Sequence, residues 1–168
     1  MGLYVGIDNG LKGGICFIDA AGKVVEKYIM PVVSSDKGKN EYDLISMVTI
    51  FKGKEIELIA LEKAHAYPGQ GVTSMFSIGK GFGMWQGIIV ALGLPYVVIP
   101  PQTWQGHVLA GMDRTDTKQA SILYAQRIAP DQDWKGTARS FKPHDGLTDA
   151  FCLARFALER YGKKTNFS

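Results

Sequence analysis

The sequence predicts an α/β fold in which one five-stranded mixed sheet carries helices on both faces. Extended hydrophobic segments crowd into the first thirty residues, and helical and strand patterns alternate from there on. The composition agrees, because 168 residues with 46% hydrophobic and 21% charged side chains have the proportions of one compact domain. We therefore expect a single domain over residues 1–168 whose core needs neither disulfides nor structural metal.

The first half of the chain predicts a meander, a helix and a fourth strand. The predicted strands of the meander are Leu3–Asp8, Gly14–Asp19 and Lys23–Met30. Helical spacing then predicts a helix over Tyr42–Phe51, and a short buried strand follows at Glu57–Leu61. Because a helix between two strands gives a right-handed crossover, we expect the fourth strand to lie parallel to the first.

The second half alternates helices with one more strand. The predicted elements are a helix over Val72–Leu92, a strand over Tyr96–Ile99, a helix over Thr117–Ile128, a loop over Ala129–His144 and a final helix over Asp145–Tyr161. Within the first of these helices, small residues recur every four positions, at Gly79, Gly83, Gly87 and Ala91. We interpret them as a stripe on which another helix or the sheet packs closely.

Net charge, cysteine content and hydropathy bear on the partners and the cellular location of the protein. The net charge of +3, from 19 basic and 16 acidic residues, is too small to indicate nucleic-acid binding by itself. If divalent metal neutralised four of the acids, the rest of the molecule would carry 19 minus 12, or +7. Cys16 and Cys152 lie in apolar runs without a CxxC partner, which favours a reducing compartment. No apolar run approaches the ~20 residues of a membrane-spanning helix, so we expect a cytoplasmic protein.

Two of the predicted strands end abruptly in a carboxylate. Asp8 ends the first strand, and Glu62 follows the hydrophobic run of the fourth. If these strands are neighbours, both carboxylates lie on one edge of the sheet and require a cation. Alternatively, Asp8 caps the turn that begins at Asn9, or Glu62 pairs with Lys63. Adjacent strand residues point to opposite faces, which argues against the second alternative.

A third acidic cluster opens the last helix. Asp145 and Asp149 are four residues apart and share one helix face. The helix dipole accounts for Asp145, whereas Asp149 lies one turn further in, on the face that packs against the sheet. Four carboxylates are hard oxygen ligands, the set that Mg²⁺ or Mn²⁺ prefers and zinc does not. Such a set suits two metal ions ~3.5 to 4 Å apart in phosphodiester hydrolysis, with no side-chain nucleophile.

Basic, aromatic and amide groups near these acids predict contacts with DNA. The candidates are Lys63, His65, Tyr67 and Gln70 in the loop after Glu62, Lys80 in the long helix, Lys118 at the start of the next helix, and Arg139 and Lys142 before Asp145. Ordinary solvated loops are the alternative for both loop segments. The glycines around Lys80 match neither the P-loop nor the dinucleotide-binding pattern, so we expect no nucleotide cofactor.

The order and spacing of the acids resemble the RuvC family of Holliday junction resolvases, specifically its phage-type branch, within the RNase H-like superfamily. The resemblance spans nearly the whole chain and is carried by Gly6–Gly10, Leu61–Gly71 and Asp145–Ala150. It implies an RNase H-like nuclease domain with strand order 3-2-1-4-5, and a homodimer. It also implies paired nicks in opposite strands of a four-way DNA junction, in the bacterial cytoplasm or a phage-infected host.

The resemblance also assigns roles to individual residues. It implies that the catalytic metal ligands are Asp8, Glu62, Asp145 and Asp149, which hold two Mg²⁺ ions that Mn²⁺ can replace. Lys118 resembles the lysine of the family that lies near the active site at the start of a helix, so it is a candidate for contact with the scissile phosphate.

The chain departs from the family pattern at two positions. Bacterial RuvC proteins place the last two ligands three residues apart, whereas here Gly146 occupies that position, so Asp145 or His144 must substitute and we favour Asp145. Many relatives carry a basic residue after the hydrophobic position that matches Trp104, whereas this chain has Gln105. Whether the corresponding phosphate contact exists in this chain is left open by the sequence.

Two other functions remain open at this point. One is a protein that binds branched DNA junctions and does not cut them. The other is an ATP-binding relative of actin and the sugar kinases, with a phosphate loop built around Asp8 and the following glycines. That fold clamps ATP between two domains, and 168 residues supply only one. A membrane partner is not expected in any of these cases.

Overall fold

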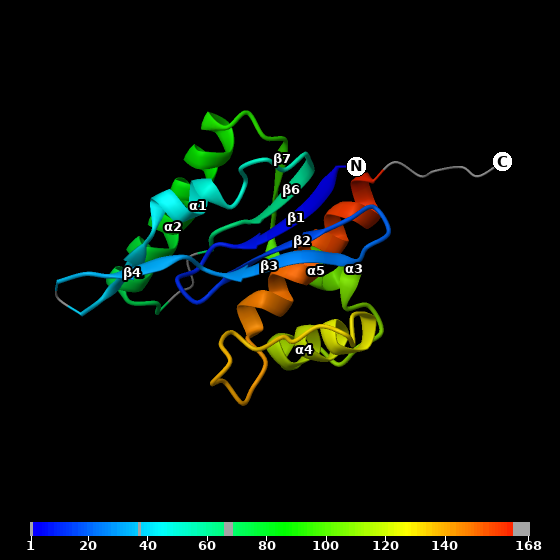
Figure 1. The fold of residues 1–168 in the computed structure, drawn as a ribbon. Helices are drawn as coiled ribbons and strands as arrows, with labels where there is room; N and C mark the ends of the chain where they lie inside the picture. The colour runs from blue at the N-terminus through cyan, green and yellow to red at the C-terminus, as the bar shows by residue number, and fades with distance from the viewer. Residues whose placement is uncertain (1, 37, 66–68, 163–168) are drawn as a thin grey trace.

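The computed structural model describes residues 2–36, 38–65 and 69–162 and contains the predicted five-stranded sheet (Figure 1). Its strands are β1 (Leu3–Asp8), β2 (Gly14–Ile18), β3 (Val24–Ile29), β6 (Ile56–Glu62) and β7 (Tyr96–Ile99). They lie in the order β3-β2-β1-β6-β7, which is 3-2-1-4-5 when these five are counted along the chain. The first three pair antiparallel, whereas β6 pairs parallel to β1 and β7 parallel to β6. The predicted fold class is confirmed.

Helices cover both faces of this sheet (Figure 1). On one face lie α1 (Leu44–Thr49) and α2 (Val72–Ala91), and on the other lie α3 (Pro101–Val108), α4 (Thr117–Ile128) and α5 (Asp145–Tyr161). A hydrophobic core lies on each face of the sheet, and successive side chains of β1 point into one core or the other. Val5 and Ile7 belong to the core under α1 and α2, and Tyr4 belongs to the core under α5. Helix α5 is buried along most of its length and packs directly on β1 and β2.

A glycine in β1 permits this close approach of α5. A Cβ atom at Gly6 would overlap the backbone carbonyl oxygen of Ala150 in the second turn of the helix. Only a residue without a side chain fits between the strand and the helix backbone at this point. The first turns of α5 are therefore held against the carboxyl end of β1.

Three features of the fold differ from the sequence prediction. The hairpin of β4 (Val32–Ser34) and β5 (Asn40–Tyr42) was not predicted, nor was α3. The helix predicted over Tyr42–Phe51 begins at Leu44, because Asp43 is its N-cap and accepts a hydrogen bond from the Ser46 N–H at 3.1 Å.

Neither the sheet nor another described helix of this chain packs on the glycine stripe of α2, so packing of the stripe on another helix stays a prediction for a second copy of the chain. A Cβ atom at Gly79, Gly83 or Gly87 would meet nothing within 4 Å, so no other part of the described chain covers the stripe. The buried residues of α2 are instead Gly81, Trp85 and Ile89, on the opposite side of the helix. The small residues therefore face outward.

The structure also bears on the cysteines and on the membrane prediction. Cys16 and Cys152 are both buried and unpaired by disulfides, as predicted. Across the described ranges, no helix combines the length and the apolar character needed to cross a bilayer. The single-domain organisation and the cytoplasmic location stay predictions.

Candidate active site

Two of the predicted acids meet at one edge of the sheet. β1 and β6 run parallel with Ile7 opposite Leu61, so the next residues, Asp8 and Glu62, leave the sheet at the same end. Both line one cavity of about 200 Å³, together with Lys63. The juxtaposition predicted from two carboxylate-ended strands is therefore present in the structure.

The first turn of α5 lies beside the β1–β2 turn. A parallel bridge joins Gly13 to Gly146, and a Cβ atom on Gly146 would overlap the carbonyl oxygen of Lys12. Gly146 therefore occupies a place where a side chain of any kind would separate α5 from this turn. The contact brings Asp145 and Asp149 toward the carboxyl end of β1.

Asp8, Glu62 and Asp149 each have a pKa that at least one other carboxylate of the set of four raises. Burial, reinforced by Asp145, raises the pKa of Asp8 to about 6, although a hydrogen bond from the Gly10 N–H opposes the rise. Burial and then Asp8 raise the pKa of Glu62 to about 8. Burial raises the pKa of Asp149 to about 7, and Asp8 and Asp145 add to this rise. Burial is the largest cause of all three shifts, and the charges of neighbouring carboxylates add to it.

Asp145 behaves differently because a lysine is paired with it. The Lys118 ammonium lies 2.6 Å from its Oδ2 atom, at the facing start of α4. Burial raises the pKa of Asp145, but the Lys118 hydrogen bond and charge outweigh it and hold that pKa below its usual value. Asp145 thus stays ionised beside three acids that burial drives toward the neutral form.

A buried hydroxyl pair aligns the two helices that carry this ion pair. The Ser121 and Thr148 hydroxyls lie 3.1 Å apart, and both residues are fully buried. Each hydroxyl also donates a hydrogen bond to a backbone carbonyl of its own helix. Ser121 donates to the Lys118 carbonyl at 3.0 Å, and Thr148 donates to the Asp145 carbonyl at 2.9 Å. The pair fixes the first turns of α4 and α5 relative to each other.

Three supporting residues were not predicted as part of the site. The Trp104 Nε1–H donates to Oε1 of Glu62 at 2.8 Å, and the Asn9 amide donates to the Glu62 backbone carbonyl at 2.5 Å. The Tyr42 hydroxyl in turn donates to the Asn9 carbonyl at 2.9 Å. Asn9 follows Asp8 directly and was interpreted only as a turn residue. No sequence pattern links Trp104 or Tyr42 to the acids.

The donor set fits a hard divalent cation in chemistry and in charge. Oδ1 of Asp149 is buried and has no hydrogen-bond partner among the described residues, and such an oxygen is costly unless a cation or donor meets it. In the conformation present here, no group of three or more described His, Cys, Asp or Glu side chains is placed to hold a metal ion. Holding one would therefore require carboxylates of the cluster to turn toward a common point.

The predicted DNA-contacting residues lie in several places. Lys63 and His65 line the cavity of Asp8 and Glu62, and Lys118 pairs with Asp145. Arg139 and Lys142 line a second cavity that Asp145 also borders. The remaining three are Gln70, whose amide donates to the Ser74 hydroxyl, Lys80, which is exposed on α2, and Tyr67, which lies outside the described residues.

Comparison with solved structures identifies the fold. The chain is similar to the RuvC of T. thermophilus in complex with a Holliday junction substrate, with a TM-score of 0.63 and 15% identity over 96% of this chain and 98% of that one. It is also similar to a second Thermus thermophilus RuvC structure, with a TM-score of 0.58 and 18% identity over 94% and 95% of the two chains. No protein-family model matches the sequence, and no curated protein matches it either.

Fold and site together define an α/β protein with a five-stranded mixed sheet and acidic side chains at the carboxyl edge of its central strands. Within that class the fold is the one found in RuvC, along nearly the full length of both chains. The phage-type branch inferred from the motifs stays a prediction.

Proposed function

We propose that this protein is a metal-dependent endonuclease that resolves four-way DNA junctions by hydrolysing phosphodiester bonds in opposite strands. The observation that carries the proposal is the cluster of Asp8, Glu62, Asp145 and Asp149, in which burial and mutual repulsion raise three of the four pKa values. The fold shared with RuvC, a protein whose structure contains a Holliday junction substrate, supports the choice of DNA.

The four carboxylates would hold two Mg²⁺ ions, which Mn²⁺ can replace, and the bound ions would activate a water molecule and stabilise the leaving oxygen. Trp104 keeps one Glu62 oxygen in a fixed direction, which limits the rotations open to that carboxylate. Asp8 and Asp149 are half-buried, and Oδ1 of Asp149 is fully buried, which strengthens the interactions of these carboxylates with charge.

For Lys118 we propose a contact with the scissile phosphate. Its side chain is 71% exposed although its ammonium pairs with Asp145, so it is accessible to an incoming polyanion. The charge of Lys118 opposes the negative charge that develops on a phosphodiester under attack. We therefore assign it to phosphate contact and the four carboxylates to metal binding.

Paired nicks require two sites, and α2 offers a surface for a second copy of the chain. Its outward side carries the exposed residues Val72, Phe76 and Val90, whose exposed fractions are 79%, 72% and 61%. The uncovered glycines of the stripe lie along the same helix. Exposed apolar side chains and small residues together favour close helix packing in a homodimer.

A cleavage assay tests this function. Four-way, three-way and linear duplex DNA would be incubated with the protein in Mg²⁺ or in EDTA, and the nicks mapped. We expect Mg²⁺-dependent symmetrical nicks near the branch point of the four-way junction. Preference for linear DNA would refute the resolvase assignment but leave the assignment as a nuclease in place. Junction binding without nicking would identify the non-cleaving alternative, and ATP turnover would favour the kinase-like one.

A further inference from the structure

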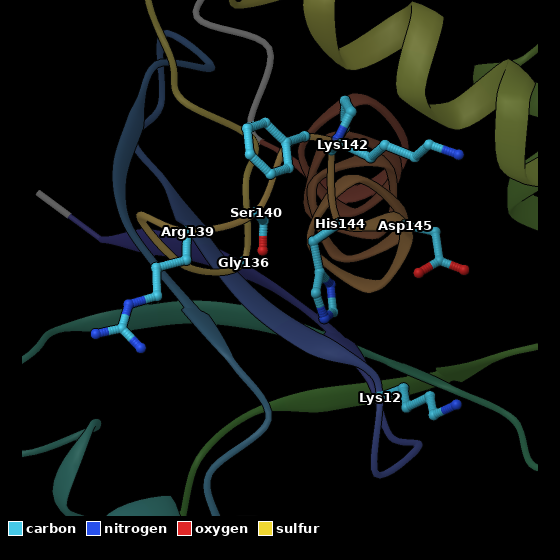
Figure 2. Close-up of a pocket in the computed structure, with 9 residues that line it drawn as sticks. Lys12, Gly136, Arg139, Ser140, Lys142, His144 and Asp145 are labelled. Atoms are coloured by element: carbon cyan, nitrogen blue, oxygen red, sulfur yellow. The ribbon is translucent and has the colours of Figure 1, made fainter.

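A cavity of about 550 Å³ adjoins the acidic cluster and is strongly basic (Figure 2). Lys12 lines it from the β1–β2 turn, and Arg139 and Lys142 line it from the loop before α5, with the Arg139 side chain pointing away from the two lysines. Asp145 is the one acid among its described lining residues, and Lys118 already pairs with that carboxylate. The cavity therefore presents three cations without a competing anion, at the border of the proposed catalytic site.

The loop that forms one wall of the cavity has a fixed internal structure. Lys135 and Pro143 form an antiparallel bridge, and the His144 N–H donates to the Trp134 carbonyl at 2.8 Å. Trp134 is only 3% exposed, and its indole stacks at an angle on Phe151 of α5. The loop is thus anchored at both ends of its turn to the hydrophobic core.

On this anchored loop, Phe141 is displayed to solvent. Its side chain is 98% exposed, the largest fraction among the exposed large hydrophobic residues of the described chain. It lines the basic cavity and also a neighbouring one of about 360 Å³, so it forms the ridge between two hollows. Packing of the folded chain does not explain this position, because an apolar ring in water gains nothing from folding.

The surroundings of Phe141 indicate the chemistry of its partner. An aromatic ring between cationic side chains is the arrangement with which proteins bind single-stranded nucleic acid, since the ring stacks on a base and the cations meet phosphates. Double-stranded DNA buries its base faces and offers no such partner. Unstacking a base costs least where the helix is already interrupted, as at a branch point.

We propose that Phe141 stacks on an unstacked base of a junction strand while Lys12, Arg139 and Lys142 contact the phosphates beside it. The cavity then holds a single-stranded segment that leads to the acidic cluster. Neither Phe141 nor Lys12 was among the residues that the sequence pattern predicts for DNA contact. The inference rests on the proposed junction-resolving function and adds a base-reading site to it.

Photo-cross-linking tests the stacking contact without relying on cleavage. Junctions carrying 5-iododeoxyuridine at single positions around the branch point would be bound in EDTA and irradiated, and the cross-linked residue identified by mass spectrometry. We expect a cross-link to Phe141 at one or two adjacent positions. Phe141→Tyr should retain it, whereas Phe141→Leu should lose it and bind the junction roughly tenfold more weakly. Ile45→Ala, which removes another exposed apolar side chain from the opposite face of the sheet, should change neither readout.

The outcomes separate this inference from the proposed function. If the wild-type protein does not bind four-way junctions, the proposed function fails. If it binds them but cross-links only elsewhere, or if Phe141→Leu binds as tightly as wild type, the stacking site is refuted and the function stands. The phosphate contacts have a separate test. Lys12→Ala should make the plot of log affinity against log salt concentration shallower, with a slope smaller in magnitude by about one. An unchanged slope would remove Lys12 from the site.

Discussion

The Trp104 indole and the Glu62 carboxylate form a hydrogen bond of 2.8 Å that ties α3 to the end of β6. Trp104 is 1% exposed, so water does not compete for its N–H group. The indole has a single donor, and it therefore fixes one carboxylate oxygen and leaves the other available. Because the bond favours the ionised form, it opposes the rise that burial and Asp8 cause in the pKa of Glu62.

Trp104→Phe should weaken catalysis without removing any proposed ligand. The substitution keeps an aromatic ring in the core but deletes the donor, so Glu62 loses both its orientation and part of its preference for ionisation. Losses of this kind typically cost about 10- to 100-fold in metal affinity or activity. We expect junction cleavage to need a higher Mg²⁺ concentration, which a titration of cleavage rate against Mg²⁺ would measure.

Trp85→Phe is the matched control for this variant. Trp85 is also fully buried, but its indole N–H has no hydrogen-bond partner among the described residues and lies in the core on the other face of the sheet. The change removes a similar volume, so any general loss of packing should appear in both variants. An equal rise in the Mg²⁺ requirement of both would contradict the role assigned to Trp104.

The sheet could be predicted well from the sequence, because each strand is encoded by a short, local pattern of residues. Four of the five sheet strands are mainly hydrophobic, β3 with Glu26 and Lys27 being the exception, and the parallel neighbour of β1 follows from the handedness of one crossover. Helix α3 was missed because Pro100 and Pro101 indicate a break, although proline is favoured at the first position of a helix. The β4–β5 hairpin was missed because its strands have three residues each and little hydrophobic pattern.

For the site, the sequence indicated which acids stand out but not what supports them. Asp8 and Glu62 interrupt hydrophobic strands, and Asp149 interrupts the buried face of a helix. Each of these acids can therefore be recognised from its neighbours in the sequence. The contact of Trp104 with Glu62 joins residues 42 positions apart, and that of Ser121 with Thr148 joins residues 27 apart. Such contacts depend on how whole helices pack, which no local pattern records.

Asp8→Asn should abolish junction cleavage and leave junction binding intact. The amide is nearly isosteric with the carboxylate, but it carries no charge for a divalent cation and still fits the turn beside Gly10. Nick formation and gel-shift affinity on the same four-way junction would be compared with wild type. Retained cleavage would remove Asp8 from the mechanism, and lost binding would show that the residue has a structural role instead.

The stability of the metal-free protein should fall as the pH rises from about 4 to about 8. In this window the native state binds more protons than the unfolded chain, because the native pKa values of Asp8, Asp149 and Glu62 are about 6, 7 and 8. Stability decreases with pH wherever the native state holds the extra protons. We expect the Tm in EDTA to drop continuously across the window, by about 2–4 °C for each kcal/mol of stability lost.

Added Mg²⁺ should reverse this loss only at the upper end of the window. Near pH 8 the carboxylates of the unfolded chain are ionised, so folding brings negative charges together and a bound cation relieves their repulsion, whereas near pH 5 bound protons already relieve it. Asp149→Asn should flatten the profile in EDTA because it removes one of the titrating groups. A Tm that rises with pH in EDTA would contradict the raised pKa values of the cluster.

Gly83→Arg should separate the proposed homodimer into monomers. A Cβ atom at Gly83 meets nothing within 4 Å, so the arginine side chain has room in the single chain and need not disturb its fold. In a dimer packed through α2, the same side chain would hold the two helices apart. Analytical ultracentrifugation would measure the mass in solution, and circular dichroism would verify that α2 remains helical. A wild-type monomer, or a dimer unaffected by the substitution, would move the interface elsewhere.

Lys118→Ala should separate catalysis from stability. The Lys118–Asp145 pair is short, but 71% of the lysine side chain is exposed, and exposed ion pairs contribute at most about 1 kcal/mol to folding. Cleavage should instead fall by about 100-fold or more, because a charge beside the scissile phosphate acts mainly on the transition state.

Lys54→Ala is the control: it breaks an ion pair of 3.1 Å with Glu26 and a contact over the Phe17 ring, on the face opposite α5. That variant should lose some stability and cleave junctions at the wild-type rate. The reverse result, with Lys118→Ala less stable but fully active, would make Lys118 a structural residue only.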